Sequence, residues 1–186
     1  MALTTLDPNT ALVVIDLQKG MLFAPVVHPF SDIVSRASAL AEAFRRHAMP
    51  VVLVNVAGGP PGRTERPRST TAFPPEFTDM LPELNQQPQD HVVTKRTPGA
   101  FTDTDLEAYL KGQGITQIVM VGVSTTSGVE STARHAFELG FNVSFAIDAM
   151  SDLDAEAHAN SVNRIFPKLG ETGTTQEVID MLEKRA

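Results

Sequence analysis

The sequence predicts an α/β protein, a three-layer α/β/α sandwich built on a mostly parallel, doubly wound sheet. Short runs rich in Val and Ile alternate with amphipathic segments along almost the whole chain. The runs are apolar at nearly every position, which is typical of strands that are covered on both faces. The alternation of strands and helices favours parallel strands that are joined by right-handed crossovers.

Five apolar runs are the predicted strands. Their lengths of five to eight residues are usual for strands in globular proteins. A short sixth strand is predicted near residues 171–174. The five runs occupy residues 11–17, 50–56, 91–95, 117–123 and 142–149.

Five segments between the runs have the spacing of amphipathic helices. The first places five apolar side chains on one stripe. In the third, Ala133 and Phe137 fall on the face predicted to be buried, and Gly140 follows as a stop signal. Pro167 is predicted to end the fourth. The predicted helices span residues 31–47, 103–112, 127–139, 154–166 and 175–184.

The segment 57–90 departs from this alternation. It contains seven prolines, and Arg63, Arg66 and Arg68 lie close together in it. A connection of this length inside a compact domain is usually a binding loop, a lid or a partly disordered segment. The sequence has no internal repeat and no second-domain boundary. We therefore expect residues 1–186 to form one domain, with residues 57–90 as a Pro-rich loop or lid within it.

Composition excludes several classes of protein. The 186 residues include 15 Lys+Arg and 22 Asp+Glu, a net charge of −7, which argues against a nucleic-acid binder. No leader and no apolar stretch of membrane-spanning length is visible, so we expect a cytoplasmic protein with no membrane partner. The chain has no Cys, which excludes disulfides, thiolate sites and a cysteine nucleophile. Its five His show no ligand spacing, so we expect no metal and no cofactor.

Two charged residues end predicted strands. In open α/β sheets, ligands bind beyond the carboxyl ends of the strands. Asp16 lies near the end of the first run and Lys95 ends the third. An unpaired charge there would be costly to bury, so we expect the two side chains to pair. The pair suits either a structural ion pair or a general acid/base Asp with a cationic partner.

A third candidate region is GVSTTSG, residues 122–128, which follows the fourth run and leads into a helix. Its small side chains allow a ligand to approach the backbone, and the first N–H groups of a helix suit an anion. Ordinary N-capping explains the same residue types. The sequence contains no GxSxG, P-loop or GxGxxG motif.

Four ordered blocks over residues 11–182 resemble the isochorismatase-like hydrolase superfamily, often called cysteine hydrolases. ALVVIDLQKG resembles the opening strand with the family's catalytic Asp, here Asp16, and VVTKRTPGAFTDTDLEAYL resembles the segment with its catalytic Lys, here Lys95. The other blocks are GITQIVMVGVSTTSGVESTARHAFELGFNVSFAIDAMSD and HANSVNRIFPKLGETGTTQEVIDML. The resemblance implies the Rossmann-like sandwich of that family.

The family's third catalytic residue is usually Cys, in a pattern similar to G-V-x-T-x-x-C-V-x-x-T-A. This chain has Gly128 at that position, and the preceding Ser127 would point elsewhere on the helix start. The resemblance therefore excludes the thiolate route of nicotinamidase-like relatives. The loop after Val56 also lacks the Asp and His pattern of their metal site. A non-proline cis peptide bond is implied at Val123–Ser124.

Isochorismatases of siderophore and phenazine pathways are similar to this chain in having Gly at that position. They hydrolyse a vinyl ether by protonating the enol-pyruvyl carbon, and pyruvate leaves after water has captured the oxocarbenium ion. The resemblance makes Asp16 the general acid, Lys95 the residue that orients substrate or stabilises charge, and Gly128 the provider of room and a backbone N–H. The candidate substrate-binding residues are Gln18, Arg96, Phe101, Ser124, Thr125 and Ser127.

The implied partner is a small, carboxylate-bearing substrate, which Arg63, Arg66 or Arg68 would meet. Enzymes of those pathways are similar to each other in a Tyr and a polar ring residue where this chain has Ser124 and Thr126. Two alternatives therefore stay open: hydrolysis of another small substrate, and a binding or scaffold protein without catalysis. The resemblance also implies a homodimer or higher homo-oligomer.

Overall fold

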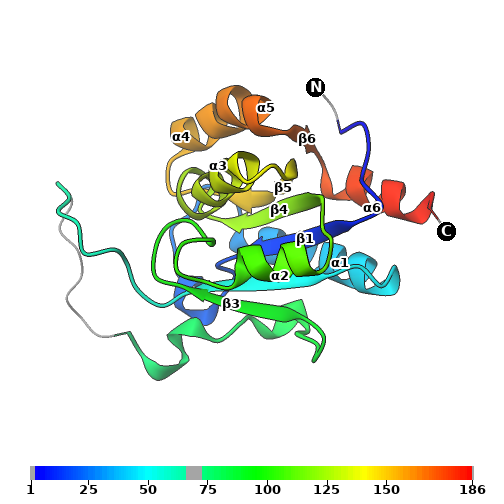
Figure 1. Cartoon of the computed structure of the whole chain (residues 1–186). Coiled ribbons are helices and arrows are strands. Elements are labelled where there is room, and N and C mark those ends of the chain that lie inside the picture. Colours follow the sequence, from blue (N-terminus) through cyan, green and yellow to red (C-terminus); the bar gives the residue numbers. More distant parts are fainter. Residues whose placement is uncertain (1–2, 66–72, 186) are drawn as a thin grey trace.

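The computed structural model describes residues 3–65 and 73–185. Within them, one sheet of six strands runs in the order β3-β2-β1-β4-β5-β6 (Figure 1). Every neighbouring pair is parallel, so the predicted doubly wound sheet is confirmed and is parallel throughout. The strands are β1 (Thr10–Ile15), β2 (Val51–Val56), β3 (His91–Lys95), β4 (Gln117–Val123), β5 (Asn142–Ser151) and β6 (Glu171–Gly173).

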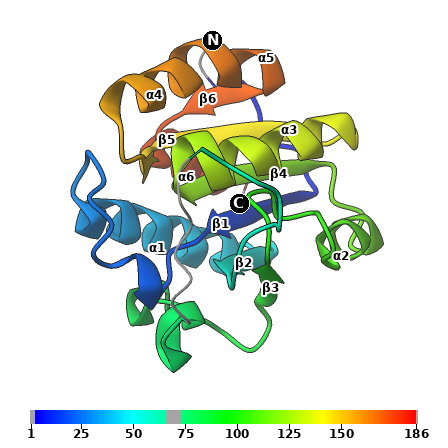
Figure 2. The ribbon, with the colours of Figure 1, turned by 90° about the vertical axis from the view of Figure 1, so that its left-hand side faces the viewer.

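Helices cover both faces of the sheet, which Figure 2 shows in a view close to the strand direction. On one face pack α1 (Phe30–Arg46) and α6 (Thr175–Glu183). On the other pack α2 (Leu106–Gly112), α3 (Glu130–Glu138) and α5 (Phe166–Leu169). Because successive side chains of a strand point to opposite faces, β1, β2, β4 and β5 contribute to both cores. This double burial explains the continuous apolar runs of the sequence. None of the helices described is long and apolar enough to cross a membrane.

Two details of the predicted helices are wrong: the end of the helix 154–166 at Pro167, and the burial of Phe137. The predicted helix 154–166 is α4 (Ala155–Asn160), a π-helical turn η5 (Ser161–Ile165) and then α5, which contains Pro167. Pro167 lies in the first turn of α5, where its missing N–H is not needed. Phe137, predicted to be buried, is 51% exposed.

The Pro-rich segment is partly packed into the molecule. It contains the 3₁₀ turns η2 (Pro75–Thr78) and η3 (Pro82–Leu84), and Leu81 and Leu84 are buried in the core beside α1. Arg63 is exposed, whereas Arg66 and Arg68 lie outside the described residues.

The strand order reverses direction between β1 and β4. From this point β2 and β3 extend to one side and β5 and β6 to the other. Connections leaving neighbouring carboxyl ends diverge to opposite faces at such a switch point, and a ligand crevice opens between them. Asp16 directly follows β1 and Ser124 directly follows β4, so the sequence places both residues at the crevice.

Candidate active site

A cavity of about 210 Å³ lies at the carboxyl ends of β1 to β4, the end that faces the viewer in Figure 2. The predicted site residues that line it are Asp16, Lys95, Ser124, Ser127 and Gly128. Residues that sequence reasoning missed complete its wall. They are Met21, Val56, Gly58, Gly59, Thr97 and Pro98.

Asp16 and Lys95 form a buried ion pair across the sheet. Lys95 Nζ donates to Asp16 Oδ2 at 2.8 Å, and the two side chains are only 2% and 8% exposed. Because β2 lies between β1 and β3, the pair spans about two strand spacings of roughly 4.8 Å each. Such a span needs a long side chain, which Lys provides. The ammonium also donates to the carbonyl oxygen of Thr97 at 3.3 Å.

The Asp16 carboxyl is held in an unusual state. Burial raises the pKa of Asp16 to about 6, and the charge and hydrogen bond of Lys95 limit that rise. Its Oδ1 is buried and has no hydrogen-bond partner within the part of the chain that is described. The backbone of Asp16 has φ 53°, a left-handed conformation that is uncommon outside glycine. One carboxyl oxygen is therefore paired, and the other is free to hold a proton near neutral pH.

Position 128 faces this carboxyl. A Cβ atom built on Gly128 would lie 3.3 Å from Asp16 Oδ2 and 2.8 Å from Ile15 Cγ2. Any side chain at this position would enter the space next to the acid and would require Ile15 to move. Glycine therefore leaves room beside Oδ2, the carboxyl oxygen that Lys95 binds.

The end of β4 approaches β1 very closely. Gly122 has φ 110°, and a Cβ atom there would lie 2.0 Å from the carbonyl oxygen of Ile15, so only glycine fits. The Val123–Ser124 peptide bond is cis, as the resemblance implied. A π-helical turn, η4 (Thr125–Val129), then carries Ser127 and Gly128 into α3.

Asp152 anchors the connection between β4 and α3, and sequence reasoning missed it. Its Oδ2 accepts hydrogen bonds from the backbone N–H of Thr126 at 2.7 Å and from the Thr126 hydroxyl at 2.8 Å. Asp152 is buried just beyond β5, two strands from β1. The signal that could have identified Asp152 is a carboxylate just past the carboxyl end of a strand. It was missed because β5 extends to Ser151, beyond its predicted end at residue 149.

Gln18 and Arg96 do not line the cavity. The Gln18 side chain is fully buried and is occupied by backbone groups: it accepts from Val56 N at 2.7 Å and donates to Phe77 O at 2.8 Å. It thereby fixes the chain that leaves β2 against the Pro-rich segment. Arg96 is exposed and donates to Ala57 O at 3.0 Å.

Phe101 and Thr125 also lie away from the cavity. Phe101 is buried in the core between the sheet and α3, where its ring packs near those of His135 and Phe141. Thr125 is fully buried, and its hydroxyl is 2.9 Å from Nδ1 of His158 on α4. Burial of His158, together with its neighbour His28, lowers the pKa of His158, which favours the neutral ring in this contact.

The rule that ligands bind beyond the carboxyl ends of the strands would have identified several of the missed cavity residues. Val56 ends β2 and the two glycines follow it, so the rule that selected Asp16 and Lys95 selects this stretch as well. Thr97 and Pro98 come two and three residues after the end of β3. Met21, on the 3₁₀ turn η1 (Lys19–Met21), had no signal in the sequence.

The charged side chains that line the cavity, among the residues described, are those of Asp16 and Lys95. Arg63 is not part of the lining. The structure described here has no group of three His, Asp or Glu side chains that could hold a metal ion.

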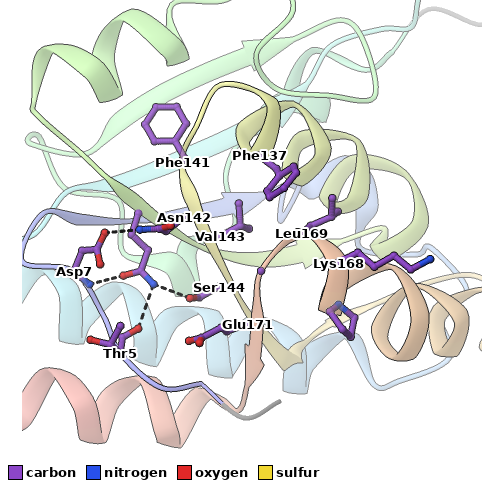
Figure 3. A pocket seen from close by; sticks show the side chains of 13 residues that line it. Thr5, Asp7, Phe137, Phe141, Asn142, Val143, Ser144, Lys168, Leu169 and Glu171 are labelled. Atoms are coloured by element: carbon purple, nitrogen blue, oxygen red, sulfur yellow. Dashed lines mark hydrogen bonds between the residues drawn. The ribbon is translucent and has the colours of Figure 1, made fainter.

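A second cavity, of about 400 Å³, lies at the opposite end of the sheet (Figure 3). It adjoins the first residues of β4 and β5, Gln117 and Asn142. Gln117 donates to Ser144 at 2.9 Å, and Asn142 donates to Asp7 at 2.9 Å. These polar side chains bind one another and brace the amino ends of the strands, so we assign the cavity no chemistry.

The parallel sheet and the buried Asp16–Lys95 pair at its switch point agree with the resemblance to isochorismatase-like hydrolases. The family model described as the isochorismatase domain matches residues 10–177, so the chain belongs to the isochorismatase family. Members of this family are hydrolases. The streptothricin hydrolase of Streptomyces noursei is 34% identical over 149 residues, which are 79% of this chain and 51% of that protein.

Two similar proteins match nearly the whole chain. The uncharacterized isochorismatase family protein YecD of Escherichia coli O157:H7 is 42% identical over 181 residues, 94% of this chain and 96% of that protein. The structure of an isochorismatase family protein from Burkholderia thailandensis superposes with a TM-score of 0.92 at 42% identity. It covers 96% of this chain and 98% of that one.

Proposed function

We propose that this protein is an isochorismatase-type hydrolase that cleaves an enol-pyruvyl ether and releases pyruvate, with Asp16 as the general acid. The observation that carries the proposal is the state of the Asp16 carboxyl. Its pKa is raised to about 6, Oδ1 has no hydrogen-bond partner among the described residues, and Gly128 leaves room beside Oδ2. A carboxylic acid that keeps its proton near neutral pH suits a reaction that begins with protonation of carbon.

The reaction needs an acid and water but no nucleophilic side chain. Asp16 donates its proton to the terminal CH₂ carbon of the enol-pyruvyl group, and the C=C electron pair forms the new C–H bond. The resulting oxocarbenium ion is captured by water at the ether carbon, and the proton that this water loses returns to Asp16. The hemiketal then collapses: its hydroxyl gives up a proton and becomes the ketone C=O of pyruvate, while the bond between the former enol-pyruvyl carbon and the ether oxygen breaks. The ether oxygen stays on the ring, takes up that proton and leaves as the alcohol.

Lys95 supports the proton transfer. As Asp16 gives up its proton, the carboxylate becomes negative within 2.8 Å of the ammonium, so the developing charge is stabilised at once. Lys95 also prevents burial from raising the pKa of Asp16 further, which would make the acid too weak to donate. Three residues of the cavity wall carry hydroxyl groups that could form hydrogen bonds with the attacking water or with polar atoms of the substrate. They are Thr97, Ser124 and Ser127.

Two alternatives make different demands on the same site. A hydrolase of another small substrate would use the same acid, and the streptothricin hydrolase relative motivates that candidate. A scaffold protein would have no need for an open space beside a buried acid, so the cavity beside Asp16 and Gly128 argues against that alternative. A protein that only binds a small ligand would use the same cavity, and turnover is the property that separates it from an enzyme.

Purified protein should be incubated with isochorismate, and pyruvate measured with a coupled lactate dehydrogenase assay. Wild type should release pyruvate, and Asp16→Asn, which keeps the shape of the side chain but cannot donate the proton, should release none. Absence of release from wild type at high enzyme concentration would refute the proposal. Turnover of a different small substrate that depends on Asp16 would instead favour the second hydrolase.

A further inference from the structure

We infer that Thr132 is a positioning residue, whose hydroxyl sets the spacing between the turn that carries Gly128 and the segment that follows Lys95. Thr132 lies on α3 and is fully buried. Its hydroxyl donates to the carbonyl oxygen of Gly128 at 2.6 Å and accepts from the backbone N–H of Ala100 at 3.0 Å. It does not line the cavity, so it acts through the groups that it joins.

The Thr132 hydroxyl connects two walls of the cavity that come from distant parts of the chain. On one side stands Gly128, next to Asp16. On the other, the segment after β3 is braced by the Thr97 hydroxyl, which donates to Gly99 O at 2.8 Å, while Lys95 Nζ donates to Thr97 O at 3.3 Å. The ammonium of Lys95 then reaches Asp16. Hydrogen bonds and the short segment 97–100 thus connect Gly128, through Thr132 and Lys95, to Asp16.

Only a hydroxyl at position 132 can hold both walls. The bond to Gly128 O is the local bond of a helical Thr to the carbonyl four residues earlier. The bond from Ala100 comes from another segment and needs an acceptor at the same atom. A hydroxyl both donates and accepts, whereas Val has the same shape and does neither. Without the hydroxyl, a buried N–H would lose its partner and the segment 97–101 would shift to find another.

The segment after β3 also packs closely against the start of α3. A Cβ atom built on Gly99 would lie 3.5 Å from the carbonyl oxygen of Ser131 and 3.7 Å from its Cβ atom, which is ordinary van der Waals contact. Gly99 is joined to Thr97 and Thr97 to Lys95 by hydrogen bonds, so we expect a shift of Gly99 to move both residues. Displacements of about 1 Å at a reacting group can cost about a hundredfold in rate.

The kinetic test rests on the proposed function. Thr132→Val should lower kcat for pyruvate release by about tenfold or more and change KM by less than about twofold, because the lost spacing matters most in the transition state. Thr132→Ser, which keeps the hydroxyl, should restore kcat to nearly the wild-type value. Equal losses of kcat in the Val and Ser variants would overturn the inference.

Thr10 offers a matched control. It is also fully buried, and its hydroxyl lies 2.7 Å from Asp7 O and 2.9 Å from Gln117 Oε1, at the far end of the sheet. Thr10→Val should lower the melting temperature and leave kcat unchanged. A comparable fall of kcat in Thr10→Val would mean that general destabilisation explains the Thr132 result, and would also overturn the inference.

A second readout needs no substrate. Titration of the Asp16 side chain, followed by its ¹³C carboxyl resonance, should show a lower pKa in Thr132→Val than in wild type, because a loosened wall admits water to the acid. Thr132→Ser and Thr10→Val should titrate as wild type does. Wild-type kcat and an unchanged Asp16 titration in Thr132→Val would refute the inference.

The two proposals fail in different ways. If wild type releases no pyruvate but the Asp16 titration moves in Thr132→Val, the proposed function is wrong and the positioning role stands. If Thr132→Val does not fold, Thr132→Ala removes the same hydroxyl with a smaller side chain and is judged by the same outcomes.

Discussion

At the scale of single residues, the chemistry depends on how Asp16 is balanced between burial and Lys95. Burial alone would make the carboxyl a very weak acid, and an ion pair in water would make it a carboxylate at neutral pH. The two effects together raise its pKa to about 6. The acid is therefore protonated in part of the molecules at neutral pH and strong enough to protonate carbon.

The pH dependence of the rate follows directly. In the proposed mechanism the protonated form of Asp16 is the active one, so kcat/KM should be highest below the pKa of about 6 and should fall about tenfold per pH unit above it. Steady-state kinetics between pH 5 and 9 measure this profile. A rate that instead increases as pH rises through 6 would show that Asp16 acts as a base.

Replacing Lys95 should move that profile. Lys95→Met keeps the length of the side chain but removes both effects that lower the pKa of Asp16, so that pKa should rise. The descending limb of the pH–rate profile should shift to higher pH, and kcat should fall because the carboxylate left by proton transfer is unpaired. A limb that stays near pH 6 in Lys95→Met would contradict the assigned electrostatic role.

Gly128→Ala should be damaging although it adds a single methyl group. The new Cβ would meet Ile15 Cγ2 at 2.8 Å and Asp16 Oδ2 at 3.3 Å. We expect loss of most activity and a destabilisation of about 1–3 kcal/mol by overpacking, measured by urea unfolding. The control is Gly112→Ala at the end of α2, where no atom lies within 4 Å of the added Cβ. That variant should keep its activity and be as stable as wild type or more so. Unimpaired activity in Gly128→Ala would show that the space is not used.

At the scale of elements, the sequence predicts the strands well because burial on both faces leaves a clear apolar signal. The sheet order and the switch point between β1 and β4 are not readable from the pattern alone. The ends of β1 and β3 were still sufficient to select Asp16 and Lys95, since carboxyl ends of parallel strands meet at one edge.

The direction of a side chain beyond a strand end is much harder to predict. Gln18 and Phe101 are close in sequence to Asp16 and Lys95, yet one binds backbone atoms and the other packs in the core. Once the chain leaves a strand, the alternation of faces no longer applies. Which residues of the loops line the cavity then depends on how the Pro-rich segment packs, and no sequence period encodes that packing.

At the scale of the whole molecule, the central sheet with helices on both faces leaves one crevice at its carboxyl edge, and the proposed chemistry is placed there. The family resemblance implies that copies of the chain associate, and we propose a homodimer or higher homo-oligomer. Sedimentation equilibrium should give a mass of at least two chains at micromolar concentration. The mass of one chain across the whole concentration range would contradict this proposal.

The most direct test of the account is hydrolysis of isochorismate in D₂O, with the product analysed by NMR or mass spectrometry. Protonation of the enol-pyruvyl carbon by an acid in exchange with solvent places one deuterium in the methyl group of pyruvate. The account predicts singly deuterated pyruvate from wild type and no product from Asp16→Asn. Pyruvate without deuterium, or undiminished release from Asp16→Asn, would contradict general-acid catalysis by Asp16.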